Sequence, residues 1–231
     1  ESVNKMDNTV FIITSDNGPE ASSIGSVKSM SMWLEYIGDY HRDYERLGEK
    51  GSFNFIGAEF ASAAASPSSY FKFYAGEGGL RVPLIFSGPQ IPAATSRNAF
   101  SMITDITPTI LDLVGIEEPM EAPAGPMSGR SLIEVIQKDT VVYADTDVIG
   151  MEAAGQCALY KGDHKLTRNG RPYGDGQWRM YNLKTDPGET ADIRSSHPTL
   201  FAELIKEYNN YASANGVIEM GINYEPLAEI T

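Results

Sequence analysis

The most constraining feature of this sequence is a short apolar run that ends abruptly in polar residues. Residues 9–15, TVFIITS, are β-branched and apolar at successive positions. Because strands covered on both faces lack the alternation of half-exposed strands, this run predicts a central parallel strand of an α/β sheet. Asp16 and Asn17 follow at the carboxyl end of the strand, where such sheets usually hold their ligands. The local sequence alone favours a plain Asn-Gly turn, and a site there is the alternative.

The rest of the first 150 residues predicts alternating helices and strands. Residues 102–115 form the best-signalled helix, with Asp105 or Thr107 as its cap and Gly115 after its end. The Gly/Ala/Ser-rich stretch 48–69 is predicted to be a long loop, which in a compact domain is usually functional or mobile. Further predictions are helices over 27–47 and 131–137, strands over 80–87 and 140–144, and a loop over 116–130.

The composition changes after residue 150. Short, partly alternating runs at 156–160, 164–167 and 177–183 surround Gly-rich turns and predict a small antiparallel sheet. Residues 198–216 predict an amphipathic helix with proline in its first turn and glycine at its end. The sequence therefore predicts an α/β part over 1–150 and a small antiparallel subdomain with a terminal helix over 151–231.

Charge and composition exclude several functions. The net charge is −13, from 18 basic and 31 acidic residues. General binding to nucleic acid or to an anionic membrane is therefore not expected, since both need a basic face. No apolar run approaches the roughly 20 residues that span a bilayer. The chain starts without an initiator Met or a signal peptide, so we expect a piece of a longer protein, and the compartment (periplasmic, secreted or cytoplasmic) stays open.

Few residues are candidates for chemistry, and two of them lie at the end of the strand. Asp16 and Asn17 are hard oxygen donors suited to Ca²⁺ or Mg²⁺. Lys72, between aromatic residues and before a Gly-rich bend, could hold an anion, although a surface lysine is the plainer interpretation. The three histidines are isolated in the sequence. Cys157, the only cysteine, is expected to be a small core residue.

Four stretches, taken in order, resemble the sulfatase family, and specifically the C-terminal part of a bacterial arylsulfatase in the alkaline-phosphatase-like superfamily. They are DNTVFIITSDNG at 7–18, Lys72 with EGGLRVPLIFSGP at 77–89, SMITDITPTILDLVGI at 101–116, and LYKGDHKL with WRMYNLKTDPGE between 159 and 189. The resemblance covers nearly the whole chain, and the ordered set is far more specific than any one stretch. It implies a sandwich with a mainly parallel sheet, followed by the small antiparallel sheet and its helix.

The resemblance also implies roles for individual residues. Asp16 and Asn17 become ligands of a divalent cation, usually Ca²⁺ with Mg²⁺ possible. Lys72 becomes the residue that contacts the sulfate of a small-molecule sulfate ester, and thus a catalytic and substrate-binding candidate. Glu77–Pro83 and the helix start at Thr107 are expected to be scaffold, and residues 186–189 a turn of the small sheet.

The sequence also departs from the family pattern. Sulfatases hydrolyse sulfate esters to an alcohol or phenol and sulfate with a formylglycine made in a Cys/Ser-x-Pro-x-Arg motif, and no such motif occurs here. We therefore expect the formylglycine in a missing N-terminal part, weak metal affinity, and no turnover by these 231 residues alone. Two alternatives stay open: a phosphonate monoester hydrolase or phosphodiesterase of the same superfamily, and a non-catalytic binding module.

Overall fold

A computed structural model describes residues 4–22, 38–117, 125–221 and 224. The chain groups into two compact units. The first consists of Glu1–Asp16 and Pro83–Asp147, and the second of Asn17–Val82 and Val148–Thr231. The predicted division at residue 150 stays a prediction, and the grouping adds that the region around Lys72 belongs with the C-terminal sheet.

The first unit contains a two-stranded sheet. Strand β1 (Phe11–Thr14) pairs antiparallel with β2 (Leu84–Ser87), after a short 3-10 helix, η1 (Met6–Asn8). Both sheets among the described residues are antiparallel, so the predicted mainly parallel sheet is not confirmed. The predicted burial of the strand over 9–15 is wrong for these residues, because Phe11 is 44% and Ile13 57% exposed. Burial of a strand depends on its neighbours, and the composition of the strand does not specify them.

Helices form the rest of the first unit. The predicted helix over 102–115 is confirmed as a 3-10 turn, η3 (Ile103–Asp105), followed by α4 (Ile106–Val114). The helix ends at Gly115 in the left-handed conformation, as its glycine indicates. The helix predicted over 131–137 is confirmed as α5 (Ile133–Gln137). The strand predicted over 140–144 is wrong, since these residues form irregular backbone with a bend at 142–143.

One buried carboxylate organises these helices. Asp105 is fully buried, and its side chain accepts hydrogen bonds from the backbone N–H of Met102 and Arg130 and from the hydroxyl of Tyr143. The predicted capping bond to α4 is not formed, because the Asp105 carboxylate instead accepts bonds from Met102, Arg130 and Tyr143. Asp105 ties the start of α4 to the segment that leads into α5.

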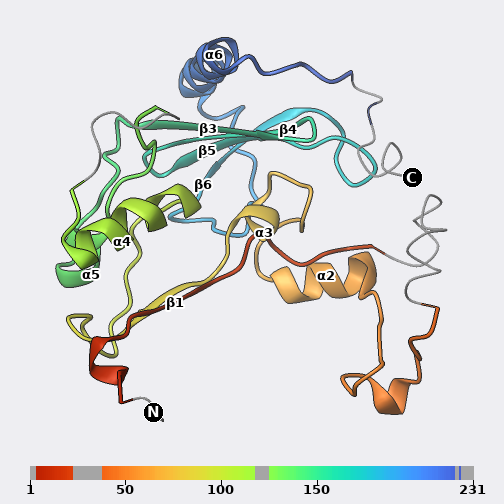
Figure 1. Ribbon diagram of the computed structural model, residues 1–231. Coiled ribbons are helices and arrows are strands. Elements are labelled where there is room, and N and C mark those ends of the chain that lie inside the picture. The colour runs from red at the N-terminus through yellow and green to blue at the C-terminus, as the bar shows by residue number, and fades with distance from the viewer. Residues whose placement is uncertain (1–3, 23–37, 118–124, 222–223, 225–231) are drawn as a thin grey trace. The chain divides into compact units, whose positions relative to one another are not determined.

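The second unit is built on a four-stranded antiparallel sheet in the order β3-β4-β5-β6. Its strands are β3 (Val148–Ala153), β4 (Gln156–Lys161), β5 (His164–Arg168) and β6 (Trp178–Asn182). The three predicted strands are confirmed as β4, β5 and β6, whereas β3 was not predicted. The predicted terminal helix is confirmed as α6 (Pro198–Asn215), which lies along one face of the sheet (Figure 1).

The two faces of this sheet differ in character. Leu166 of β5 belongs to the apolar cluster against α6, together with Leu204 and Tyr208 of the helix. The neighbours of Leu166 along the strand, Lys165 and Thr167, point to the opposite face because side chains alternate along a strand. Both are buried. On that face the sheet is covered by residues 69–80, which include the short helix α3 (Glu77–Leu80) (Figure 1).

Three predictions for the first part of the second unit need correction. The stretch 48–69 is not a continuous loop, because it contains α2 (Gly57–Ala65), whose alanine-rich sequence has high helix propensity. The helix predicted over 27–47 falls partly on residues 23–37, outside the described residues, and the described remainder contains only the 3-10 turn η2 (Tyr44–Arg46). Residue 80, predicted as the start of a strand, instead ends α3. In the part of the chain that the structure describes, no helix is both long and apolar enough to cross a membrane.

Candidate functional site

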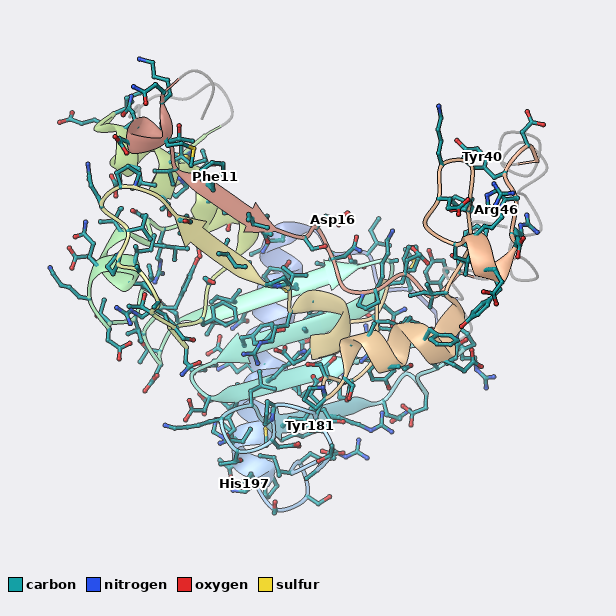
Figure 2. The ribbon with its side chains drawn as sticks, turned by 90° about the horizontal axis from the view of Figure 1, so that it is seen from below. Phe11, Asp16, Tyr40, Arg46, Tyr181 and His197 are labelled. Atoms are coloured by element: carbon teal, nitrogen blue, oxygen red, sulfur yellow. The ribbon has the colours of Figure 1, made fainter. Side chains whose placement is uncertain are left out.

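The Asp-Asn pair lies immediately after β1, where the sequence places it. Asp16 is exposed beyond the end of the strand (Figure 2). Its Oδ1 accepts a hydrogen bond from the Ser15 hydroxyl at 3.4 Å. Asn17 is half-buried and donates from Nδ2 to the carbonyl of Gly18 at 2.8 Å. The pair thus forms a polar turn directly after β1, with oxygen-bearing side chains on two consecutive residues.

The turn is packed closely against the start of α3. Gly18 is buried, and its N–H donates to the carbonyl of Gly79 at 2.9 Å. A Cβ at Gly18 would lie 1.8 Å from the carbonyl oxygen of Gly78. A Cβ at Gly79 would lie 2.2 Å from the carbonyl oxygen of Tyr74. Both glycines are therefore required by close backbone approach, and they fix the turn after Asn17 to the segment that carries Lys72.

Lys72 lies beside this turn. Its backbone N–H donates to the carbonyl of Pro19 at 3.0 Å, which joins the two predicted site segments directly. Its ammonium group is 2.9 Å from Oε2 of Glu20 and 5.3 Å from the ring centroid of Phe73. The two charged side chains are 33% and 36% exposed. The structure therefore places Lys72 at a partly solvated position, as an ion pair rather than as a single cation.

Glu20 is held by more than the lysine. Its Oε1 accepts hydrogen bonds from the backbone N–H of Ser22 at 3.0 Å and from the Ser22 hydroxyl at 2.8 Å. Partial burial works against ionisation of Glu20, but the bonds from Lys72 and Ser22 outweigh it and lower the carboxyl pKa. The carboxylate would keep its serine partners if the lysine turned towards another anion.

The fit of a divalent cation to this turn depends on the number of donors. Asp16 and Asn17 offer about three side-chain oxygens of the hard type that Ca²⁺ prefers, whereas Ca²⁺ takes about six to eight. Among the described residues, no three His, Cys, Asp or Glu side chains gather in a way that could hold a metal ion. The donor chemistry of the turn suits calcium, and its described neighbourhood supplies only part of a coordination sphere.

A buried ionic cluster beneath α3 was not predicted from the sequence. We call Glu77, Lys165 and Glu189 the buried triad. Lys165 Nζ is 2.8 Å from Oε1 of Glu77 and 2.9 Å from Oε1 of Glu189. The lysine side chain is 0% exposed, and the two carboxylates are 7% and 2% exposed. Glu189 also accepts the backbone N–H of Glu77 through Oε2 at 2.7 Å, and the hydroxyl of Tyr160 donates to Oε1 of Glu77 at 2.7 Å.

The two carboxylates of the triad differ in their proton affinity. Burial works against ionisation of Glu77, but attraction to Lys165 and the bonds from Lys165 and Tyr160 hold its pKa below the ordinary value. Burial raises the pKa of Glu189, and its bonds do not fully offset that cost. Glu189 is therefore the first of the two to take up a proton as the pH falls.

Residues at the end of β5 and just after it make further hydrogen bonds to Ala75, in the segment 69–76 that carries Lys72. Thr167 donates from Oγ1 to the carbonyl of Ala75 at 3.4 Å, and Asn169 accepts the N–H of Ala75 through Oδ1 at 2.7 Å. Lys165, Thr167 and Asn169 alternate along the chain, and all are buried. Polar residues with period two in HKLTRN are the signal that could have predicted a polar buried face. Their partners lie more than 85 residues away, so the sequence did not reveal what covers that face.

The remaining candidates, the cysteine and the histidines, join no cluster of three possible metal ligands in the described part of the chain. Cys157 is 1% exposed within the core against α6, which confirms the prediction of a core residue. His41 pairs with Ser52 in an isolated bridge, His164 begins β5, and His197 precedes α6. The segment 186–189, predicted as a turn, does form one, with Asp186 accepting the N–H groups of Thr190 and Ala191. That turn also delivers Glu189 to the triad.

Comparison with known proteins gives one matching family model, Sulfatase, over residues 1–116. An uncharacterised sulfatase of Schizosaccharomyces pombe is 31% identical over 223 residues, which cover 94% of this chain and 40% of that protein. An arylsulfatase of Klebsiella aerogenes is 28% identical over 130 residues, or 54% of this chain and 27% of the relative.

A solved structure, BT4656 in complex with its substrate D-glucosamine-2-N,6-O-disulfate, superposes with a TM-score of 0.54. The two chains are 21% identical, and the match covers 92% of this chain and 35% of that one. At that identity the likeness concerns the fold alone. The chain spans less than half the length of these relatives. Because the family model covers half of the sequence, including the Asp-Asn turn and Lys72, this chain belongs to the sulfatase family.

Proposed function

We propose that this chain forms part of a sulfatase that hydrolyses sulfate esters to an alcohol or phenol and sulfate, with Lys72 binding the sulfate and Asp16 and Asn17 contributing to a cation site. The observation that carries the proposal is the pair of backbone bonds, Lys72 to Pro19 and Gly18 to Gly79, that hold the two segments together. In such an arrangement the carboxylate and amide oxygens can hold a divalent cation. The cation and the lysine can then together neutralise the charge of a bound anion.

The ion pair with Glu20 does not prevent Lys72 from binding an anion. A pair about one-third exposed is worth about 1 kcal/mol or less, since water screens it. A sulfate ester held by a nearby cation would compete readily with that interaction. Glu20 keeps its two Ser22 bonds when the lysine leaves, so the exchange abandons no carboxylate.

Each group would have a distinct task in the reaction. Negative charge builds on the leaving oxygen and on the sulfuryl oxygens as the sulfur–oxygen bond to the leaving group breaks. An ammonium group fixed at those oxygens stabilises them without reorganisation during the reaction. A bound divalent cation would supply Lewis-acid stabilisation there, and Asp16 and Asn17 would hold it by oxygen ligands. The nucleophile expected of this family is a formylglycine, whose motif this sequence lacks.

The test uses the full-length protein that contains this sequence. We expect Lys72→Ala to lower kcat/KM for an aryl sulfate by about 10²- to 10³-fold, as removal of a preorganised donor to a developing oxyanion does. Lys184→Ala is the matched control, because Lys184 is 73% exposed and pairs only loosely with Asp163 at 3.4 Å. Equal activities of the two variants would refute the role of Lys72.

The cation site has an independent measurement. We expect Asp16→Ala and Asn17→Ala to weaken Ca²⁺ binding in calorimetric titration, with Lys72→Ala leaving it near the wild-type value. The 231-residue chain by itself is expected to bind Ca²⁺ weakly and to show no turnover. Tight binding or aryl sulfate hydrolysis by that chain alone would contradict the proposal.

Two other functions predict different results in substrate and variant assays. A phosphonate monoester hydrolase or phosphodiesterase of the same superfamily would turn over phosphonate esters faster than aryl sulfates in paired rate measurements. A non-catalytic binding module would show no turnover and would keep its ligand when Lys72 and Asp16 are replaced. The match to an arylsulfatase favours the sulfate ester, and the substrate named for BT4656 makes a sugar sulfate a second class to assay.

A further inference from the structure

The strongest unexplained feature is the buried triad. A lysine that is 0% exposed and flanked by two buried carboxylates requires a reason, since taking such charges out of water is costly. Replacement by apolar residues of similar size is often neutral or stabilising for a protein. The triad is therefore a weak source of stability, and its use must be sought in what it holds in place.

The contacts of the triad lead to the candidate site in a short series. Glu189 and Lys165 hold Glu77 by its backbone N–H and its carboxylate, at the first residue of α3. Two residues further along α3, the carbonyl of Gly79 accepts the N–H of Gly18, which belongs to the turn after Asn17. The N–H of Gly78 also donates to the carbonyl of Ser69 at 2.7 Å, at the start of the segment 69–76 that carries Lys72.

The segment 69–76, which carries Lys72, is held in place on both sides of the lysine. The Ser69 hydroxyl donates to the carbonyl of Gly188 at 2.6 Å, next to Glu189. Ala75 is bonded to Thr167 of β5 and to Asn169 just after it. Phe71 and Tyr74 pack against the ring of Tyr173 at centroid distances of 5.1 and 5.9 Å. Lys72 lies between these fixed points, and the first of them, the Gly188 carbonyl, is one residue from Glu189 of the triad.

We propose that Lys165, with Glu77 and Glu189, is a positioning device that sets the place of Lys72 and of the turn after Asn17, and so determines the affinity of the site for sulfate. The inference rests on the proposed function of Lys72. Lys165 touches no substrate; it acts through the backbone of α3 and of residues 69–76.

The test measures inhibition by inorganic sulfate and turnover of an aryl sulfate by the full-length protein at saturating Ca²⁺. All assays are done well below the unfolding midpoint of each variant. We expect Lys165→Met to raise the sulfate inhibition constant about tenfold and to lower kcat/KM at least as much. Lys161→Met is the matched control: Lys161 lies on the neighbouring strand, and pairs at 2.6 Å with Glu203 of α6, on the opposite face of the sheet. We expect that variant to stay within twofold of wild type in both constants.

A double variant separates positioning from general destabilisation. If Lys165 acts through Lys72, Lys72→Ala/Lys165→Met has the same sulfate inhibition constant as Lys72→Ala alone, because the interaction is already lost. Independent, multiplying losses would overturn the inference. So would a Lys165→Met protein whose midpoint falls while its inhibition constant and kcat/KM match wild type.

Glu189→Gln provides a second measurement where Lys165→Met does not fold. It removes the charge and keeps an oxygen that can accept the Glu77 N–H, and we expect an inhibition constant raised about threefold. An unchanged constant would overturn the inference. If Lys72→Ala itself leaves sulfate inhibition unchanged, the proposed function fails, whereas an effect of Lys72→Ala without one of Lys165→Met or Glu189→Gln refutes the positioning role alone.

Discussion

The two units treat their apolar side chains in opposite ways. In the second unit, Leu159, Leu166, Met180 and Leu204 are 0% exposed, and they pack between the sheet and α6. In the first unit, large apolar residues of the strands and helices remain open: Ile13 57%, Ile85 52%, Ile103 61% and Val114 61% exposed. The first unit buries Leu132, Val135 and Ile136, but both hydrophobic clusters found among the described residues belong to the second unit.

The difference lies in what each unit's strands contact. A two-stranded sheet has two open edges and, without a helix against it, two open faces, whereas three or more strands with a covered face can be stable alone. The sheet of the second unit meets that condition on both faces, with α6 on one and the segment 69–80 on the other. Stability is therefore expected to be concentrated in the second unit, where Lys72 is also held.

The largest test of this comparison is a core truncation in each unit. Leu166→Ala should lower the free energy of unfolding by about 2–5 kcal/mol, because it leaves a cavity in a fully buried site. Ile85→Ala, at a side chain 52% exposed, should cost under about 1 kcal/mol. Denaturant unfolding followed by the fluorescence of Trp178, which packs on the core of the second unit, measures the first variant directly. Circular dichroism measures both variants, and equal losses would remove the distinction between the units.

A medium effect is expected at the close backbone contact above the triad. Gly79→Ala places a Cβ 2.2 Å from the Tyr74 carbonyl oxygen, so the backbone must move, and we expect a loss of about 1–3 kcal/mol. Gly221→Ala is the control, because nothing lies within 4 Å of a Cβ there. Thermal unfolding of both variants is the measurement. An unshifted midpoint for Gly79→Ala would show that residues 69–80 yield easily and do not hold Lys72 rigidly.

The smallest expected effect is a surface contribution to the pH dependence of the second unit. The hydrogen bonds from Arg179 lower the pKa of Asp175 to about 2. A carboxyl whose folded pKa is depressed contributes stability above its unfolded pKa, and this contribution is lost as the pH falls from about 4 towards 2. Because the pair is largely exposed, we expect less than about 1 kcal/mol, reduced further by salt. Asp175→Asn should flatten the acid limb of stability by that amount in acid titrations, and an unchanged limb would exclude the pair as a contributor.

Local sequence predicted the elements whose signals are local. Pro198 and Gly216 frame α6 as proline and glycine commonly do at helix ends, and Gly115 ends α4 in the same way. The alternation in residues 156–183 identified three of the four strands of the C-terminal sheet. The failures occurred where context decides. The strand over 9–15 is exposed. The stretch 48–69, whose glycines and serines suggested a loop, includes the helix α2, which its alanines favour.

The candidate site shows the same division. Asp16, Asn17 and Lys72 were found in the sequence through ordered motifs, and their roles in binding metal and sulfate stay predictions. The ion pair of Lys72 with Glu20 could not be found that way, because it depends on the backbone bond between Lys72 and Pro19. The sequence placed Glu77 and residues 186–189 in motifs as scaffold and turn, without their shared partner.

The sequence by itself determined the family, the helix ends and the alternation of the C-terminal strands, because each is encoded in residues close together along the chain. Tertiary structure alone decided which polar residues are buried together. Lys165 stands 88 residues after Glu77 and 24 before Glu189, and only the fold brings the three charges within 3 Å contacts. The cost of burying a charge is offset only by partners at hydrogen-bond distance, and no local pattern can specify a partner so far along the chain.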